Sequence, residues 1–463
     1  MRTYSLDNRN GETLTETLYR AIRADIGTLP AGERMPSKRA LAQHLKISVI
    51  TVENAYAQLV AEGYLRAEAR RGFFVEQTAA GVGGAVCRTA VDADEPSPPE
   101  WRLDLKTNRV DPARFPFATW SRLMRQVLSE QDKKLLQPTP HQGVPVLRQA
   151  IADYLRSFRG MEVTPGQIVV GAGTEYLYQL LLQLLGTAQP FAVEDPGYPK
   201  LAKIYGKGGA VCCPVPLDEQ GISLSALLAS GAGVAHISPS HHYPTGAVTS
   251  MGRRQELLRW AGQERTIIED DYDSEFRFAG RPIRPLQSMD EHGRVIYMNT
   301  FSQTIAPSMR ISYMVLPPAL LAQYRRELDF YACTVPSFEQ YALAKFIGEG
   351  YFEKHLARMR TYYRRQRERV LAAFRGSPFA GRITLTEKGA GLHFLLRLDT
   401  QQSDEALRHS AAARGVRLSF LSEYAALPNP DFDHTLVVNY SGAGWDCPED
   451  AIALLAEIFA CGG

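Results

Sequence analysis

The sequence lacks cysteine motifs, long apolar runs and any large net charge. Its six cysteines show neither C-x-x-C spacing nor a disulfide-dense pattern, which favours reduced, mostly structural thiols. No apolar run approaches the length of a membrane span, and residues 1–9 lack the apolar centre of a signal peptide. We therefore expect a cytoplasmic protein with no membrane partner.

The charge balance is too even to indicate nucleic-acid binding by the surface as a whole. The formal charge is +2, from 52 basic and 50 acidic residues. Any DNA contact must therefore come from a local basic surface. At 463 residues and 45% hydrophobic content, the chain should hold more than one domain, because single cores stop growing near about 250–300 residues.

Residues 14–75 show the pattern of three helices and a hairpin. Apolar residues recur every four positions from Leu14 to Ile26, which predicts one amphipathic helix. Ser37 and Ser48 are candidate N-caps of two further helices, and the short turn between these helices predicts a helix-turn-helix. Residues 64–75 then predict two short strands around a basic tip.

Three stretches of this region, 29–42, 51–59 and 62–65, resemble the DNA-binding domain of GntR-type regulators. The resemblance implies a winged helix over residues 1–77 that binds double-stranded operator DNA. Val49 stands where such proteins often have arginine. Without the resemblance, the pattern also fits a helix-turn-helix that never contacts DNA. The resemblance implies that phosphates are held by Ser37, Lys38 and Arg39. It implies that the major groove is contacted by Ser48, Thr51 and Asn54. Arg70 and Arg71 would approach the DNA backbone or the minor groove.

Residues 78–100 are small and Gly-rich, then acidic and Pro-rich, which predicts a flexible linker. From 101 to 463 the pattern changes to short apolar segments separated by helical stretches. Such a pattern predicts an α/β domain with a mostly parallel sheet, covered on both faces and binding its ligand at the carboxyl ends of the strands. We expect a large lobe over about 140–316 and a smaller α+β lobe over about 350–463. The predicted strands of the large lobe are 167–171, 190–194, 233–238, 265–269, 295–298 and 313–316.

Residues 267–276 and 297–316 resemble the cofactor-binding core of fold-type-I aminotransferases, which use pyridoxal 5'-phosphate (PLP). The resemblance implies that Asp270 pairs with the pyridine nitrogen, that Tyr272 reaches the ring hydroxyl, and that Ser302 and Arg310 bind the phosphate.

Two further loops fit the same resemblance. The turn at 171–175 follows a predicted strand and opens a helix, so its free amides suit a phosphate, and it contributes Gly173 and Thr174. In the loop at 194–200, Tyr198 would stack on the pyridine ring and Lys200 would lie near the carboxylate of a substrate or effector.

Gln303 stands where the resembling family has the lysine that binds PLP covalently. A primary amide has delocalised its lone pair, so it is neither a nucleophile nor a base that relays protons. Val437 likewise stands where an arginine for the substrate carboxylate is expected. We therefore expect catalysis to be lost or nearly lost, while noncovalent PLP binding remains open.

His241 and His242 suggest a metal pair at first sight. Adjacent histidines point in different directions, and no carboxylate or cysteine has the spacing of a further ligand. We predict no metal site.

Together the two domains resemble the MocR/GabR family of bacterial transcription regulators. The resemblance implies a head-to-tail homodimer whose effector is PLP, or a preformed adduct of PLP with an amino acid. Two alternatives remain open: a PLP-dependent aminotransferase with a fused DNA-binding domain, and a cofactor-free dimerisation scaffold.

Overall fold

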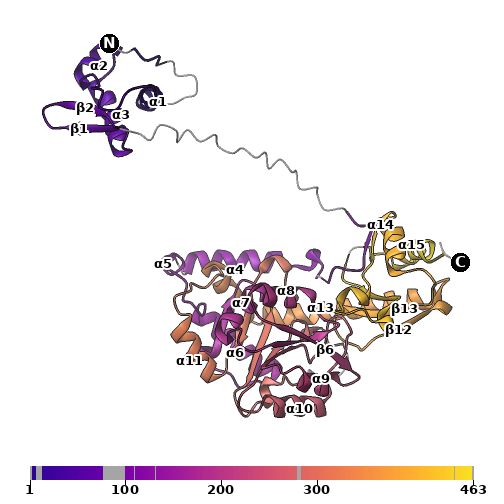
Figure 1. Cartoon of the computed structure of the whole chain (residues 1–463). Coiled ribbons are helices and arrows are strands. Elements are labelled where there is room, and N and C mark those ends of the chain that lie inside the picture. Colours follow the sequence, from indigo (N-terminus) through magenta and orange to yellow (C-terminus); the bar gives the residue numbers. More distant parts are fainter. Residues whose placement is uncertain are drawn as a thin grey trace. The chain divides into compact units, whose positions relative to one another are not determined.

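A computed structural model divides the chain into two compact units, Met1–Pro98 and Pro99–Gly463 (Figure 1). The predicted linker at 78–100 lies outside the described residues, except for Glu100. The structure describes residues 3–6, 13–76, 100–108, 110–130, 132–278, 283–442 and 444–460.

The N-terminal unit is a winged helix, which confirms the predicted fold. Helices α1 (Leu14–Ile26), α2 (Lys38–Leu45) and α3 (Val49–Ala61) precede an antiparallel hairpin of β1 (Leu65–Glu68) and β2 (Gly72–Val75). The hydroxyls of Ser37 and Ser48 cap α2 and α3, because a serine oxygen accepts a hydrogen bond from a free backbone N–H at the start of a helix. Its core comprises Tyr4, Leu18, Ile22, Ile26, Met35, Leu41, Ala42, Val52, Ala55, Tyr56, Leu59, Leu65 and Val75.

The large lobe of the second unit is built on an eight-stranded sheet in the order β4-β11-β10-β9-β8-β5-β6-β7. Five adjacent strands, β10, β9, β8, β5 and β6, are parallel to one another. Strand β11 runs antiparallel to both of its neighbours. The mostly parallel sheet is confirmed. The strands are β4 (Ile168–Gly171), β5 (Phe191–Asp195), β6 (Cys212–Asp218), β7 (Gly221–Ile222), β8 (Val234–Ile237), β9 (Thr266–Asp270), β10 (Val295–Thr300) and β11 (Ser312–Val315).

Helices cover both faces of this sheet (Figure 1). Successive residues of β9 show the two faces: Ile267 belongs to the same core cluster as Leu257 of α10, and Ile268 to the same cluster as Leu177 of α7. The helices of this lobe are α4 (Phe117–Glu130), α5 (Asp132–Leu135), α6 (Pro145–Tyr154), α7 (Thr174–Leu185), α8 (Pro199–Lys207), α9 (Leu224–Ala229), α10 (Met251–Ala261), α11 (Pro318–Glu327) and α12 (Ser337–Gly348).

Helix α13 (Tyr351–Arg375) leads to the smaller lobe. There β12 (Ile383–Thr386), β13 (His393–Leu398) and β15 (Thr435–Asn439) form an antiparallel sheet. The start of the unit also belongs here, because Leu103 and Leu105 lie in the core of this lobe. The remaining elements are β3 (Leu103–Asp104), which pairs with β14 (Val416–Arg417), and helices α14 (Asp404–Ala412) and α15 (Pro448–Ala460). In the described part of the chain, no helix is long and apolar enough to cross a membrane.

Candidate functional site

Asp270 is the last residue of β9 and lies at the carboxyl edge of the sheet. The hydroxyl of Tyr178 donates a hydrogen bond of 2.6 Å to its Oδ2 atom. Its Oδ1 atom is buried and has no hydrogen-bond partner among the described residues. One carboxylate oxygen is therefore held in place, while the other is left to accept from a ligand.

A second layer of buried groups supports this carboxylate. His236 Nε2 lies 3.5 Å from Asp270 Oδ2, and His236 Nδ1 lies 2.8 Å from the hydroxyl of Tyr205. Burial raises the pKa of Tyr178 well above its ordinary value, and the charge of Asp270 adds to the shift. Tyr178 therefore stays protonated and remains a donor to Asp270.

Gly173 and Arg310 form a close contact at the start of α7. Gly173 is the N-cap residue, with φ +91°, and a Cβ atom there would lie 2.3 Å from Arg310 Nη2. The guanidinium therefore occupies the space that any other residue at 173 would need. Ser302, just beyond β10, has a buried Oγ atom for which the described residues supply no partner. These groups are donors suited to a phosphate beside free helix amides.

Glu175 joins two of the predicted cationic residues. Its carboxylate lies 2.9 Å from Arg310 Nη2 and 3.1 Å from Lys200 Nζ. The hydrogen bond from Lys200, followed by the charges of Lys200 and Arg310, lowers the pKa of Glu175. Tyr198, the N-cap residue of α8, is 41% exposed beside Lys200. Its ring is therefore accessible to a ligand.

Tyr272 and Gln303 make weaker contacts. The Tyr272 hydroxyl lies 3.4 Å from His241 Nδ1, and burial, with the nearby Asp273, raises the pKa of Tyr272 well above its ordinary value. The Gln303 amide donates a 3.3 Å hydrogen bond to the backbone oxygen of Asn108.

The residues present fit PLP for two reasons. Asp270 and Ser302 have buried oxygens without a partner among the described residues, and only a glycine at 173 leaves space for the Arg310 guanidinium beside the start of α7. The sequence prediction missed Tyr178 and Glu175. Helical spacing places Tyr178 on the same face of α7 as Thr174, four residues earlier, but this spacing does not indicate its pairing with Asp270.

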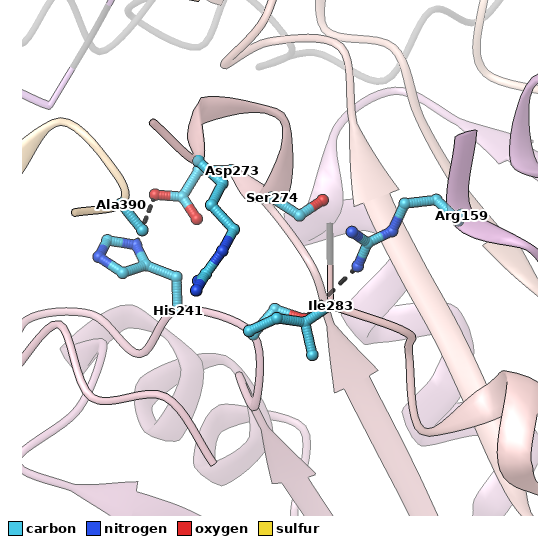
Figure 2. Close-up of a pocket in the computed structure, with 8 residues that line it drawn as sticks. Arg159, His241, Asp273, Ser274, Ile283 and Ala390 are labelled. Carbon is cyan, nitrogen blue, oxygen red and sulfur yellow. Dashed lines mark hydrogen bonds and ion pairs between the residues drawn. The ribbon is translucent and has the colours of Figure 1, made fainter. Parts of the chain in front are cut away.

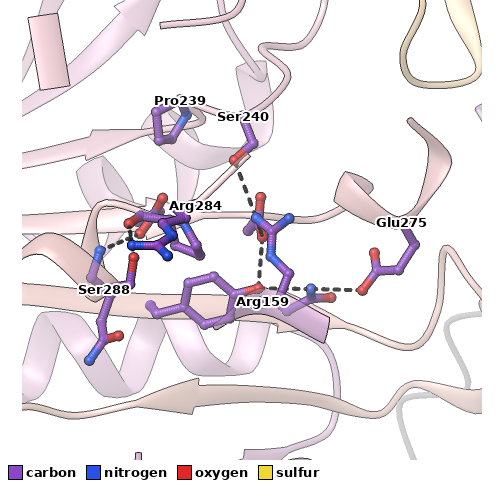
Figure 3. Close-up of polar contacts among 12 residues, drawn as sticks. Arg159, Pro239, Ser240, Glu275, Arg284 and Ser288 are labelled. Carbon is purple, nitrogen blue, oxygen red and sulfur yellow. Dashed lines mark hydrogen bonds and ion pairs between the residues drawn. The ribbon is translucent and has the colours of Figure 1, made fainter. Parts of the chain in front are cut away.

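A buried ionic network surrounds Arg159 (Figure 3). Arg159 Nη2 lies 2.5 Å from Asp271 Oδ2, which also accepts a 2.7 Å hydrogen bond from Tyr297. Asp271 is thus ion-paired to Arg159 through Oδ2, while its Oδ1 atom, like that of Asp270, is buried without a partner among the described residues.

A small pocket borders the same network, between Arg159, His241 and Asp273 (Figure 2). His241 Nδ1 lies 2.8 Å from Asp273 Oδ2, whereas His242 Nδ1 lies 2.8 Å from Thr245 Oγ1. The two histidines therefore have separate partners. The structure, over the residues it describes, holds no group of three or more residues suited to a metal ion.

On the winged helix, several predicted DNA-contacting residues have partners within the domain. The Ser37 and Ser48 hydroxyls accept hydrogen bonds from the backbone of α2 and α3, and Lys38 lies 2.6 Å from Glu53. Arg39, Asn54, Arg70 and Arg71 are exposed. Exposed Val49 and Ile50, on the first turn of α3, were not predicted as DNA contacts.

Comparison with known protein families identifies both units. Residues 103–426 match the family "Aminotransferase class I and II", and residues 14–75 match "Bacterial regulatory proteins, gntR family". The chain belongs to the aminotransferase class I and II family, whose fold implies PLP dependence, and it carries a GntR DNA-binding domain. More narrowly, it is one of the MocR-type HTH transcriptional regulators, as its relatives show.

The relatives share both units over most of their length. An HTH-type transcriptional regulator of Bacillus subtilis, YdeL, is 36% identical over 88% of each chain. The probable rhizopine catabolism regulatory protein MocR of Rhizobium meliloti is 34% identical over 90% of this chain and 88% of its own. The pyridoxine biosynthesis regulator PdxR of Corynebacterium glutamicum is 31% identical over 89% of this chain and 88% of its own.

Solved structures confirm the fold of the second unit. Kynurenine aminotransferase of Pyrococcus horikoshii superposes with a TM-score of 0.68 at 24% identity, covering 78% of this chain and 91% of that chain. A multiple-substrate aminotransferase of Thermococcus profundus gives the same TM-score and identity, and the match covers 78% of this chain and 92% of that chain. The predicted fold-type-I aminotransferase domain is therefore confirmed.

Proposed function

We propose that this regulator binds operator DNA as a head-to-tail homodimer in the cytoplasm, and that its aminotransferase-like domain binds PLP noncovalently as a sensor. The effector is PLP itself or a preformed adduct of PLP with an amino acid. The observation that carries the proposal is a PLP-compatible site around position 303, where glutamine stands in place of lysine.

Each part of the cofactor has a candidate partner. Asp270 would hold the pyridine nitrogen through its unpartnered oxygen, and Ser302, Arg310 and the backbone at Gly173 and Thr174 would hold the phosphate. Tyr198 would lie on the ring face, and Tyr272 would reach the ring hydroxyl. Bound PLP supplies an aldehyde and an electron-poor ring, which recognise amino groups.

The side chains present argue against a working aminotransferase. Gln303 offers an amide, which neither attacks a carbonyl nor relays a proton. The hydrogen bond to Glu175 raises the pKa of Lys200, so this amine stays protonated at neutral pH and is a poor replacement nucleophile. Val437 has an apolar side chain that is buried in a cluster with Leu421 and Tyr424, so it cannot pair with a substrate carboxylate.

Footprinting of the full-length protein on its own promoter region tests the proposal. We expect protection of a specific site that changes in extent or affinity when PLP, or PLP with an amino acid, is added. Asp270→Ala protein is the control: it should protect the same site without responding to PLP. Protection that stays the same after every addition of PLP would favour the cofactor-free scaffold. Absence of protection would contradict the proposal that the protein is a DNA-binding regulator.

A further inference from the structure

Glu175 bridges two cations that come from separate segments of the chain. Arg310 follows β10 and precedes β11, whereas Lys200 lies in the first turn of α8. The Glu175 carboxylate contacts Arg310 at 2.9 Å and Lys200 at 3.1 Å. The Glu175 side chain is 40% exposed to solvent, so a ligand from solvent can reach the ion pair.

Glu175 also stands in the first turn of α7, directly after the Gly173–Thr174 turn. A negative charge there is stabilised by the free amides and the dipole of the helix. A phosphate at this position would use the same amides and the same guanidinium. The carboxylate therefore supplies, from within the chain, the charge that a phosphate would bring.

We propose that Glu175 is an internal competitor for the phosphate group of the ligand, and that it sets how strongly the site prefers a phosphorylated pyridoxal over an unphosphorylated one. This inference rests on the proposed function. A phosphate that takes Arg310 must displace the Glu175 carboxylate from it, and the two negative charges repel each other across the start of α7. Lys200 gives Glu175 a second cationic partner, so the carboxylate keeps an ion pair when it gives up Arg310.

This arrangement gives Lys200 a different task from the predicted one. The ammonium lies within hydrogen-bonding distance of Glu175, so its charge is already partly neutralised. Lys200 then acts as a positioning residue that holds the competing carboxylate, and it does not serve first as the site for an effector carboxylate.

The test compares full-length wild-type protein with Glu175→Gln protein in titrations with PLP and with pyridoxal, which lacks the phosphate. We expect Glu175→Gln to bind PLP about five- to tenfold more tightly, since one charge-assisted contact at a partly exposed site is freed for the ligand. Pyridoxal affinity should stay unchanged. Glu327→Gln is the matched control, because Glu327 is 41% exposed and pairs with Arg326 at 2.7 Å, on α11.

Unchanged or weaker PLP binding by Glu175→Gln, with wild-type protein that binds PLP, overturns the inference and leaves the proposed function intact. An equal gain for PLP and pyridoxal also overturns it, because the phosphate would then not be the competing group. Wild-type protein that binds neither compound defeats the proposed function. In that case thermal unfolding with inorganic phosphate decides the role of Glu175: greater stabilisation of Glu175→Gln than of wild type supports the competition, and equal stabilisation overturns it.

Discussion

The hydroxyl of Tyr178 donates a 2.6 Å hydrogen bond to Oδ2 of Asp270, and the two residues are 92 positions apart in the sequence. Helix α7 therefore orients the carboxylate at the end of β9. Since Oδ1 is buried without a partner in the described structure, the site has an acceptor ready for a protonated ring nitrogen.

We expect Asp270→Asn to weaken PLP binding by more than about tenfold, because a hydrogen bond to a charged group contributes about 1.5–3 kcal/mol. Tyr178→Phe should weaken it less, because it removes only the orienting contact. Absorbance titration measures both. Tyr331→Phe, which removes a hydroxyl that bonds to Gln183 away from the site, is the control. Equal affinities for Asp270→Asn and wild type would show that Asp270 does not contact the ligand.

Gly173→Ala should abolish tight PLP binding, since the added Cβ would lie 2.3 Å from Arg310 Nη2 and push the guanidinium aside. The φ of +91° adds backbone strain of about 1–3 kcal/mol. Gly186→Ala, at the other end of α7, also has a positive φ, but its Cβ would meet no atom within 4 Å. Thermal unfolding should show that both variants lose stability, and PLP titration should show that only Gly173→Ala loses affinity. Equal PLP affinity of the two variants would contradict this role of Arg310.

Stability should depend on pH through Glu194, whose Oε2 lies 3.5 Å from His242 Nε2. Burial raises the pKa of Glu194 from 4.5 to about 8. Between these values the unfolded chain has released the proton that the folded chain keeps, so this group makes stability fall as pH rises, by about 1.4 kcal/mol per pH unit. Burial lowers the pKa of His242 from 6.5 to about 3, so that group makes stability fall as pH drops below 6.5.

Glu194→Gln removes the first effect and keeps the second. Between pH 6.5 and 8, where the His242 effect is absent, denaturant unfolding should therefore give a shallower decline for Glu194→Gln than for wild type. Parallel curves for the two proteins would mean that Glu194 is already ionised in the folded state.

The hairpin of the winged helix should contribute to DNA binding through charge. Arg70→Ala should reduce the slope of log affinity against log salt by about one and weaken binding to all sequences alike. Arg71 lies 2.5 Å from Glu68, so Arg71→Ala should have the smaller effect. Arg326→Ala, on α11 of the other unit, is the control. A slope that Arg70→Ala leaves unchanged would place the hairpin away from the phosphates.

Local signals in the sequence were sufficient for much of the fold. The cap serines Ser37 and Ser48 mark where α2 and α3 begin, and the apolar segments mark six strands of the large sheet. Strand β6 was missed because prolines at 214 and 216 and its partly exposed side chains hide the apolar pattern.

The candidate site was less accessible to prediction. Motifs supplied Asp270, Ser302 and Arg310, but the partners Tyr178 and Glu175 depend on pairings across 92 and 135 residues. A single sequence contains no signal for such pairings, because they are set by how β4, β9 and β10 lie together in the sheet.

The most direct test of the account is a PLP absorbance titration of wild-type protein and of Gln303→Lys protein, each treated with borohydride and then dialysed under denaturing conditions. The account predicts saturable binding by both proteins, with PLP retained after denaturation only by Gln303→Lys. Two results would contradict it: wild-type protein that shows no saturable binding, or wild-type protein that retains PLP covalently through another lysine.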